Sequence, residues 1–564
     1  MHTDSTGANL RLQGALPLLP LIFMAMAWLN PIHNQPWLGF WSDSFAAIAF
    51  LLIFLKIAIR YKNNIELPKL GIVFLLVSLI PWVQLTFGQI SHVGVAWVNF
   101  IYLFGFSLAF LTGWNWEKNE AGRGLDFIFS AVLLASVSSV GMQLKQCFFP
   151  EITWRWIPSG FGSRFAGSLS HPNLLGTLHV WGLLGVVWIG SRWNVDWRVS
   201  VAAIFWLLTG IALVESRTAW LNVVIVFAGL YFFWKNSRPR FLGGALGLFT
   251  AYLIAMYFLV PQVNALFQHS SVNYRDGYDS VRLDLWRTFL QAFLERPWFG
   301  YGFGGGREAY IVGNIPNFSA WPSHTHNLLL DVAIYVGVPG IIIFLGGVFF
   351  LLRCFWSRRK DGDLRFIVPS LVLLALLTHA MLEYPMHYAF FLLPAALVLG
   401  HFLRMVCVGN GVPVRIPLLY GMLVLVMVAV LITLVEGLKI ERIFNEGEDS
   451  VIVKNGKGHV RQFMIFDQWD DRLRLATIPK NVALTPEISK KISQVLVAAP
   501  SADLILKYVE ILNANQATSE AQYWVNILCN TSPLMYKQDI LSRMQSLEYE
   551  KIRVNELDWR ACRG

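Results

Sequence analysis

The chain has 564 residues, of which 55% are hydrophobic and only 14% are charged, and its mean hydropathy is +0.51. This composition lies outside the usual range of soluble globular proteins and excludes that class. The net charge of +10 does not indicate nucleic-acid binding, because the basic residues are spread through short loops and form no patch with aromatic residues between them. The five cysteines have no metal-ligand or redox spacing, so we predict no metal site and no cofactor.

Apolar segments long enough to span a bilayer, which takes about 20 mostly apolar residues, recur along most of the chain. The sequence therefore predicts an all-α polytopic membrane protein with about 13 transmembrane helices. We interpret the first segment as a retained helix, because no signal-peptide cleavage site follows it. The expected segments cover residues 15–33, 41–60, 69–88, 94–116, 125–149, 172–190, 199–215, 218–234, 241–260, 327–352, 366–383, 388–406 and 417–436.

The distribution of Lys and Arg predicts the orientation of these segments. When the loops are assigned alternately to two sides, the side of the N-terminus carries most of the basic residues, so we assign it to the cytoplasm. The predicted regions are an N-terminal transmembrane region of about nine helices at 1–260, a large outer loop with an amphipathic helix at 261–326, a C-terminal transmembrane region of about four helices at 327–436, and an outer helical domain at 437–564.

The polar tail is predicted to be a small soluble helical domain. Residues 503–512 and 519–528 have the apolar spacing of paired amphipathic helices, but they are too few for a repeat array. If the tail lies outside the cytoplasm, Cys529 and Cys562 could form a disulfide.

Several polar residues stand where predicted spans meet the outer loops. Arg217 belongs to Glu215-Ser216-Arg217-Thr218, which leaves almost no loop between two spans. A charge so close to the hydrocarbon is costly unless it is paired or functional. Either Glu215 neutralises Arg217, or the guanidinium binds the oxygens of a phosphate group.

The outer loop contains a predicted amphipathic helix, in which Leu283, Trp286, Leu290 and Phe293 recur at helical spacing. This helix could lie on the outer leaflet, with Arg282 on the same side as Trp286. The glycine-rich run at 300–306 follows no strand and lacks the Lys-Ser/Thr of a P-loop, so we do not interpret it as a nucleotide site.

Two histidines, His324 and His326, precede the apolar segment at 327–352. Imidazole exchanges protons near neutral pH, so this pair is the first candidate for chemistry, although a histidine at a membrane edge is often only an interfacial residue. A span beginning near Asn327 would direct the positive end of its dipole here and favour an anion and a neutral His326. Other outer polar residues are Arg164, Glu383 and Tyr384, whereas we interpret His171 as structural.

These residues resemble those of the bacterial O-antigen ligase and O-oligosaccharyltransferase superfamily. The resemblance spans about residues 160–400. Its elements are Arg-x-x-Gly with Pro-Asn (Arg164, Gly167, Pro172, Asn173), Ser-Arg-Thr (Ser216 to Thr218), Arg-x-x-x-Trp with Pro-x-x-Gly-x-Gly (Arg282, Trp286, Pro297, Gly300, Gly302), and His-x-His-Asn with Gly-x-x-Gly (His324 to Asn327, Gly337, Gly340). The segment 382–394 and the soluble tail are most similar to PglL-type protein O-oligosaccharyltransferases.

The resemblance implies a GT-C-type glycosyltransferase of the bacterial inner membrane, with its active site and C-terminal domain in the periplasm and no metal. It implies en bloc transfer of an oligosaccharide from undecaprenyl diphosphate to Ser or Thr of a periplasmic protein, often a type IV pilin. By motif match, His326 is the expected base, assisted by His324, and Arg217 and Arg282 are expected to bind the diphosphate. Arg164, Glu383 and Tyr384 are expected donor contacts.

Three alternatives stay open at this point. The chain could be an O-antigen ligase or polymerase that uses a sugar acceptor. It could be a transporter of lipid-linked glycans, although the polar residues lie at one surface and no internal repeat is evident. The histidine pair could bind a metal if a carboxylate such as Glu383 joined it.

Overall fold

The structure of the protein, a computed structural model, is almost entirely helical over the residues that it describes. Strands β1 (Glu66–Leu67) and β2 (Val412–Pro413) form a two-residue antiparallel pair, in which Glu66 is paired with Pro413. The described residues are 18–33, 36–37, 39–152, 154–158, 164–234, 242–266, 278–313, 322–407, 411–446, 462–499, 501–531 and 557.

Each of the thirteen predicted apolar segments coincides with helical structure. Among the described residues, nine helical segments are long and apolar enough to cross a membrane. They are α3 (Phe40–Arg60), α4 (Lys69–Val77) together with α5 (Ile80–Thr86), α6 (Val93–Asn119), α7 (Arg123–Phe148), α8 (Pro172–Arg192), α11 (Leu242–Leu266), α14 (Leu328–Arg358), α16 (Ala389–Val406) and α17 (Ile416–Glu446). The helical, polytopic class is thereby confirmed.

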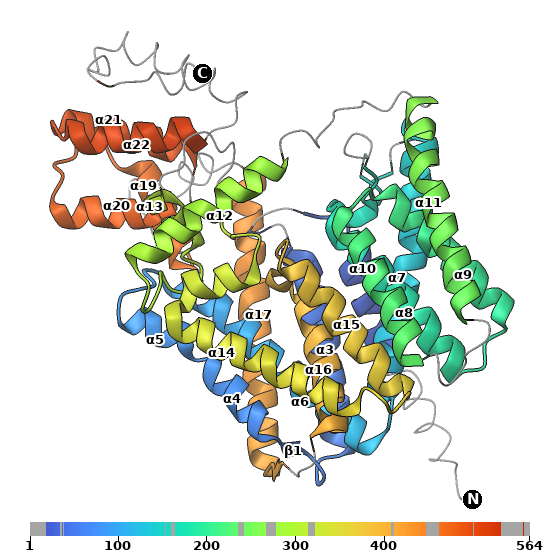
Figure 1. Cartoon of the computed structure of the whole chain (residues 1–564). Coiled ribbons are helices and arrows are strands. Elements are labelled where there is room, and N and C mark those ends of the chain that lie inside the picture. The colour runs from blue at the N-terminus through green and yellow to red at the C-terminus, as the bar shows by residue number, and fades with distance from the viewer. Residues whose placement is uncertain are drawn as a thin grey trace, which may run out of the picture. The chain divides into compact units, whose positions relative to one another are not determined.

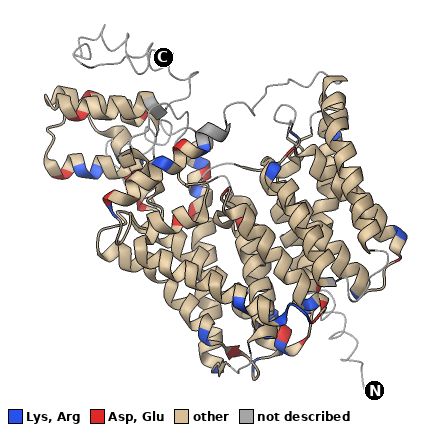
Figure 2. Cartoon of the chain, viewed as in Figure 1, with Lys and Arg blue, Asp and Glu red and all other residues tan. Residues whose placement is uncertain are grey.

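Four further apolar helices do not meet that criterion of length and hydropathy. They are α2 (Leu18–Leu29), α9 (Trp197–Leu213), α10 (Arg217–Trp234) and α15 (Leu364–Ala380). They match the other four predicted segments. Because their length does not establish that they cross a membrane, the total of about 13 spans stays a prediction. Figure 2 shows charged residues mostly at helix ends and in the connections, with long uncharged stretches between them.

The chain forms two compact units, each assembled from separate stretches of sequence. Unit 1 comprises Met1–Ser78, Tyr102–Tyr274 and Gly346–Leu434, and unit 2 comprises Leu79–Ile101, Arg275–Leu345 and Val435–Gly564. Helices α6, α14 and α17 contribute residues to both units. The four consecutive regions expected from the sequence were defined by their position relative to the membrane. The two compact units do not test that division, so it stays a prediction.

Unit 1 is a bundle in which α7 packs against α8 and α8 against α9, and these three helices lie together in Figure 1. Its closest helix contact depends on glycine. A Cβ atom added at Gly113 of α6 would lie 2.0 Å from the Leu397 carbonyl oxygen of α16, and one at Gly400 would lie 2.1 Å from that of Phe110. Small residues at both positions therefore allow the two backbones to touch, as is typical of membrane helices.

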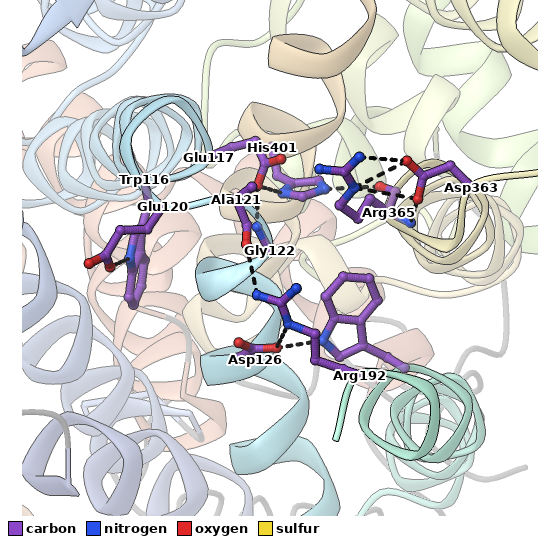
Figure 3. Close-up of polar contacts among 11 residues, drawn as sticks. Trp116, Glu117, Glu120, Ala121, Gly122, Asp126, Arg192, Asp363, Arg365 and His401 are labelled. Atoms are coloured by element: carbon purple, nitrogen blue, oxygen red, sulfur yellow. Dashed lines mark hydrogen bonds and ion pairs between the residues drawn. The ribbon is translucent and has the colours of Figure 1, made fainter. Parts of the chain in front are cut away.

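A buried polar cluster joins helix ends within unit 1 (Figure 3). Glu117 of α6 accepts a hydrogen bond of 2.6 Å from the Gly122 backbone N–H and lies 2.9 Å from Nδ1 of His401 on α16. The other ring nitrogen of His401 is 2.9 Å from the Arg365 carbonyl oxygen of α15. His401 of α16 thus forms a hydrogen bond with α15 and lies within ion-pair distance of Glu117 on α6, contacts that account for a buried imidazole here.

Unit 2 contains the predicted amphipathic helix, α12 (Tyr278–Glu295), which packs against α13 (Gly306–Gly313). The side of α12 that faces the protein carries Leu285, Phe289 and Ala292, whereas Leu283 and Leu290 are exposed. The predicted helix is confirmed, and part of its predicted apolar stripe is exposed. Contact of that stripe with lipid stays a prediction.

The tail forms four short helices within unit 2: α19 (Asp467–Thr477), α20 (Pro486–Ala498), α21 (Ala502–Ala514) and α22 (Thr518–Thr531). The last two lie side by side, as predicted, and share a core that includes Tyr508 and Trp524. Cys529 is disulfide-bonded, whereas Cys147, Cys354 and Cys407 have free thiols. The predicted partner, Cys562, lies outside the described residues.

Carboxylates attach the tail to membrane helices of the same unit. Asp467 accepts hydrogen bonds from the Val93 and Gly94 backbone N–H groups, at 3.1 and 3.0 Å, and so caps the N-terminus of α6. Buried Glu436 of α17 accepts from the consecutive N–H groups of residues 464–466. Interaction with His92, whose Nε2 lies 3.6 Å from a carboxylate oxygen of Asp471, lowers the pKa of Asp471.

Candidate active site

In unit 1, the side chain of Asn173 connects three of the sequence elements singled out above. Its Oδ1 accepts hydrogen bonds from Ser216 Oγ at 2.7 Å and from an Arg164 Nη2 at 3.2 Å, and its Nδ2 donates to Glu383 Oε1 at 2.9 Å. The elements come from the starts of α8 and α10 and from the turn before α16. The structure therefore brings Arg164, the Ser-Arg-Thr segment and Glu383 together, as predicted.

The surroundings of Arg164 are those of a residue that positions its neighbours. Its Nε donates to the Val214 carbonyl oxygen at 3.2 Å, close to the end of α9, while its Nη2 bonds Asn173. A cation there also complements the negative end of the helix dipole. Direct contact of Arg164 with a donor substrate stays a prediction.

Arg217 is exposed at the first residue of α10, where backbone N–H groups also point outward. Ser216 caps this helix by accepting from the Ala219 N–H at 3.2 Å. Glu215, just before it, has a φ of 46°, in the left-handed region, and its Oε1 accepts from Asn264 of α11. A non-glycine residue held in that region marks a constrained turn, which fixes the direction in which α10 begins.

Tyr384 lies in the turn before α16, with its ring 5.9 Å from those of His171 and Tyr388. The turn is held by Asp43 of α3, which sequence reasoning missed. Asp43 is buried, accepts a 2.6 Å hydrogen bond from the Ala389 N–H at the start of α16, and accepts another from the Tyr102 hydroxyl at 2.5 Å. A carboxylate within an apolar span was the signal that could have identified it.

The histidine segment belongs to unit 2 and ends in a well-defined helix cap. Asn327 Oδ1 accepts from the Leu329 and Leu330 N–H groups, at 3.0 and 3.2 Å, so α14 begins at Leu328 as expected. Buried Asp331 accepts from the Thr325 N–H at 2.8 Å. Between these anchors, His326 has a φ of 56°. The candidate base therefore stands in a strained backbone conformation, at the positive end of a helix.

His324 and His326 have different surroundings. His324 Nδ1 is 3.3 Å from the hydroxyl of Tyr335, which lies about two turns into α14, and both histidines are partly exposed. A ligand atom of His324 also lies within 4.8 Å of a carboxylate oxygen of Asp331. Asp331 is thus a carboxylate that could serve the metal alternative, although one of its oxygens already accepts from the Thr325 N–H. The predicted absence of a metal stays a prediction.

The glycine-rich run packs on α14. Gly300, Gly302 and Gly304 all have positive φ, and a Cβ added at Gly300 would lie 2.3 Å from the Ile334 carbonyl oxygen. Tyr301 anchors the turn by donating from its hydroxyl to the Ala292 carbonyl oxygen at 2.8 Å, and burial raises its pKa to about 12. The glycines therefore permit close backbone approach, and the rejection of a nucleotide site stays a prediction.

The seven predicted site residues divide between the two units. Arg164, Arg217, Glu383 and Tyr384 belong to unit 1, and a cluster around Asn173 joins the elements that carry them. Arg282, His324 and His326 belong to unit 2, where Arg282 is partly exposed near the start of α12. The roles of both sets, and the convergence of the two sets on one substrate, stay predictions.

Two family profiles match the chain. Residues 202–345 match the family described as O-antigen ligase, and residues 368–528 match the one described as virulence factor membrane-bound polymerase, C-terminal. The chain is similar to a general O-oligosaccharyltransferase of Acinetobacter baylyi, with 29% identity, covering 68% of this chain and 69% of the relative. It is also similar to a ComP-specific O-oligosaccharyltransferase of that organism, with 25% identity, covering 68% and 70%.

These matches support a place for the chain in the O-antigen ligase and O-oligosaccharyltransferase superfamily. Within this superfamily, its resemblance is to the PglL type, which confirms the resemblance inferred from the motifs. The superfamily profiles include Arg217, Arg282, both histidines, Glu383 and Tyr384, whereas Arg164 lies before them. The second profile runs from α15 into α22 and so includes most of the tail.

Proposed function

We propose that the chain is a protein O-oligosaccharyltransferase of the bacterial inner membrane. It transfers an oligosaccharide en bloc from undecaprenyl diphosphate to a Ser or Thr hydroxyl of periplasmic proteins, such as a type IV pilin. The observation that carries the proposal is the similarity, over about two thirds of the chain, to two relatives that are named O-oligosaccharyltransferases. The capped, strained histidine segment and the exposed Arg217 at a helix start support it chemically.

In the proposed reaction, Arg217 and Arg282 bind the diphosphate of the donor. Guanidinium groups offset the negative charge that grows on this leaving group as the glycosidic bond breaks. The start of α10 adds backbone N–H groups and a positive dipole end beside Arg217. Arg164, Glu383 and Tyr384 complete the donor site in this proposal, with Asn173 holding the elements that carry the first two.

His326 acts as the general base in this mechanism. Its imidazole takes the proton of the acceptor hydroxyl while that oxygen attacks the anomeric carbon from the face opposite the diphosphate. The bond from the anomeric carbon to the diphosphate oxygen breaks, its electron pair leaves with undecaprenyl diphosphate, and the configuration is inverted. The imidazolium then returns its proton to water. His324, beside Tyr335, orients His326 or the acceptor.

The test of this assignment is His326→Ala in purified protein with lipid-linked oligosaccharide and an acceptor protein. We expect transfer to fall by about 100-fold or more, because general-base catalysis contributes on the order of 10²–10⁴. Donor binding and the amount of monodisperse protein should stay unchanged. Lys491→Ala is the control, since Lys491 is an exposed tail residue that forms a surface ion pair with nearby Glu487. Near-normal transfer by His326→Ala would remove His326 from the chemistry.

A second candidate function is ligation or polymerisation on a sugar acceptor, favoured by the polymerase description of the family matched at 368–528. Glycan labelled on the lipid-linked donor would then reach lipid A core or a growing glycan, with no mass change in periplasmic proteins. A more remote candidate is transport of the lipid-linked glycan, in which label would cross the membrane without forming a new glycosidic bond. Intact glycoprotein analysis of cells with and without the chain separates the three.

A further inference from the structure

Helix α14 is broken shortly after the histidine segment. Gly337 has a φ of 74° and a ψ of −156°, a conformation that other residues rarely adopt, and Pro339 follows it. In a continuous helix, the carbonyl oxygens of Ile334 and Tyr335 would accept from the N–H groups of residues 338 and 339. Pro339 has no N–H, and the Val338 N–H donates instead to the Pro297 carbonyl oxygen at 2.8 Å. Both carbonyl groups thus lose their helical donors.

Two donors from outside α14 replace them. The Tyr301 backbone N–H donates to the Ile334 oxygen at 2.7 Å, and the Gln84 side-chain Nε2 donates to the Tyr335 oxygen at 2.8 Å. The same Gln84 amide accepts, through Oε1, a 2.9 Å hydrogen bond from the Phe303 backbone N–H. Gln84 therefore uses both ends of its amide to join the glycine-rich turn to the break in α14.

The break is coupled to the histidine segment through Tyr335. The carbonyl oxygen of this residue is bound by Gln84, and its hydroxyl lies 3.3 Å from His324 Nδ1. The turn held by Gln84 also touches the segment directly, because a Cβ added at Gly306 would lie 2.0 Å from the Ser323 carbonyl oxygen. A shift of Tyr335 or of the turn would therefore be transmitted to residues 322–331.

We propose that Gln84 is a positioning residue that fixes residues 322–331 for the reaction. Its side chain is 4% exposed within α5, an apolar segment in which a primary amide is costly unless it is fully hydrogen-bonded. The two bonds described above satisfy it and complete the break. This role rests on the proposed function, because the reaction that it supports is the proposed glycan transfer by His326.

The experiment compares Gln84→Met with Gln89→Met in the full-length protein. Methionine has a similar volume but neither donates nor accepts these bonds. Gln89 is the matched control, because its side chain also donates to the start of the same turn, at the Phe299 carbonyl oxygen (3.2 Å), but forms no hydrogen bond with the described residues of α14. Gln84→Glu keeps an acceptor for the Phe303 N–H and serves as a second variant if Gln84→Met yields too little folded protein.

Two readouts are measured on each variant. Hydrogen exchange followed by mass spectrometry reports how well the backbone amides of residues 322–336 are protected from exchange. This measurement does not depend on activity. We expect at least tenfold faster exchange there in Gln84→Met, and wild-type exchange in Gln89→Met. Glycan transfer should show kcat lowered by about 10- to 100-fold with the donor KM unchanged. A misplaced general base slows the chemical step but does not weaken binding of the donor.

Each outcome decides the proposal. Faster exchange in 322–336 together with lower kcat supports it, and so does partial recovery in Gln84→Glu. Unchanged exchange overturns it, as does faster exchange with a normal kcat or an equal effect in Gln89→Met. If the wild-type chain shows no glycan transfer to any acceptor, the proposed function fails separately, whereas the exchange measurement still reports on the restraint of residues 322–331.

Discussion

The side-chain amide of Asn173 connects three parts of unit 1. It accepts from Ser216 and Arg164 and donates to Glu383, so a single side chain connects the starts of two helices to the turn before a third. Only a carboxamide can accept twice through one atom and donate through the other. This requirement explains why the Pro-Asn element has asparagine beside a carboxylate, where aspartate would repel Glu383.

We predict that Asn173→Leu destabilises the protein by about 2–5 kcal/mol, because hydrogen bonds between membrane helices contribute about 0.6–1.7 kcal/mol each and three are lost. Thermal unfolding in detergent measures this, and glycan transfer should fall with it. Asn222→Leu is the control: Asn222 is also buried, on α10, but its amide has no hydrogen-bond partner in the described part of the chain. That variant should be neutral or stabilising. Equal losses in both variants would contradict the assigned role of Asn173.

At the residue scale, the sequence singled out candidate residues but could not predict what they contact. The histidine pair, the arginines and Glu383 stand out because charges and imidazoles at the ends of apolar segments are unusual. Gln84 and Asp43 lie inside apolar segments, and no local pattern says that they reach Tyr335 or Ala389, which are more than 200 residues away. Such partners depend on tertiary packing, which no short sequence window contains.

At the scale of elements, apolar length predicted each membrane helix, while the breaks within them were harder to predict. The pair Gly337 and Pro339 signals a possible break, but only the structure shows that the glycine-rich turn supplies the replacement donor. The turn's glycines could otherwise suggest phosphate binding. Their spacing instead reflects close contact with Ile334 and Ser323, which is a packing requirement.

The attachment of the tail gives a prediction at this scale. Asp467→Ala removes two hydrogen bonds at the N-terminus of α6 and a favourable charge there, so we expect α19 and its contacts to loosen by about 1–2 kcal/mol. Limited proteolysis of the tail should become several-fold faster. Glu487→Ala provides the comparison, because Glu487 lies in the first turn of α20 but forms an exposed pair with Lys491. A tail equally resistant in wild type and Asp467→Ala would show that the cap does not hold it.

For the whole molecule, orientation decides whether the proposed acceptors are reachable. The distribution of Lys and Arg predicts that residues 322–327 and the tail are periplasmic, and the disulfide of Cys529 agrees with an oxidising compartment. Those two arguments are independent, since one concerns loop charge and the other concerns thiol chemistry. The proposed function requires both segments on the same side as the acceptor protein.

Cysteine labelling tests the orientation in a chain whose three free cysteines, Cys147, Cys354 and Cys407, are replaced by serine. We expect a membrane-impermeant maleimide to label Glu487→Cys, an exposed tail position, in intact spheroplasts. Asp361→Cys, exposed after α14, should be labelled only once the membrane is permeabilised, because the loop there is predicted to be cytoplasmic. The reverse pattern would place the tail in the cytoplasm, and transfer to periplasmic proteins would then be excluded.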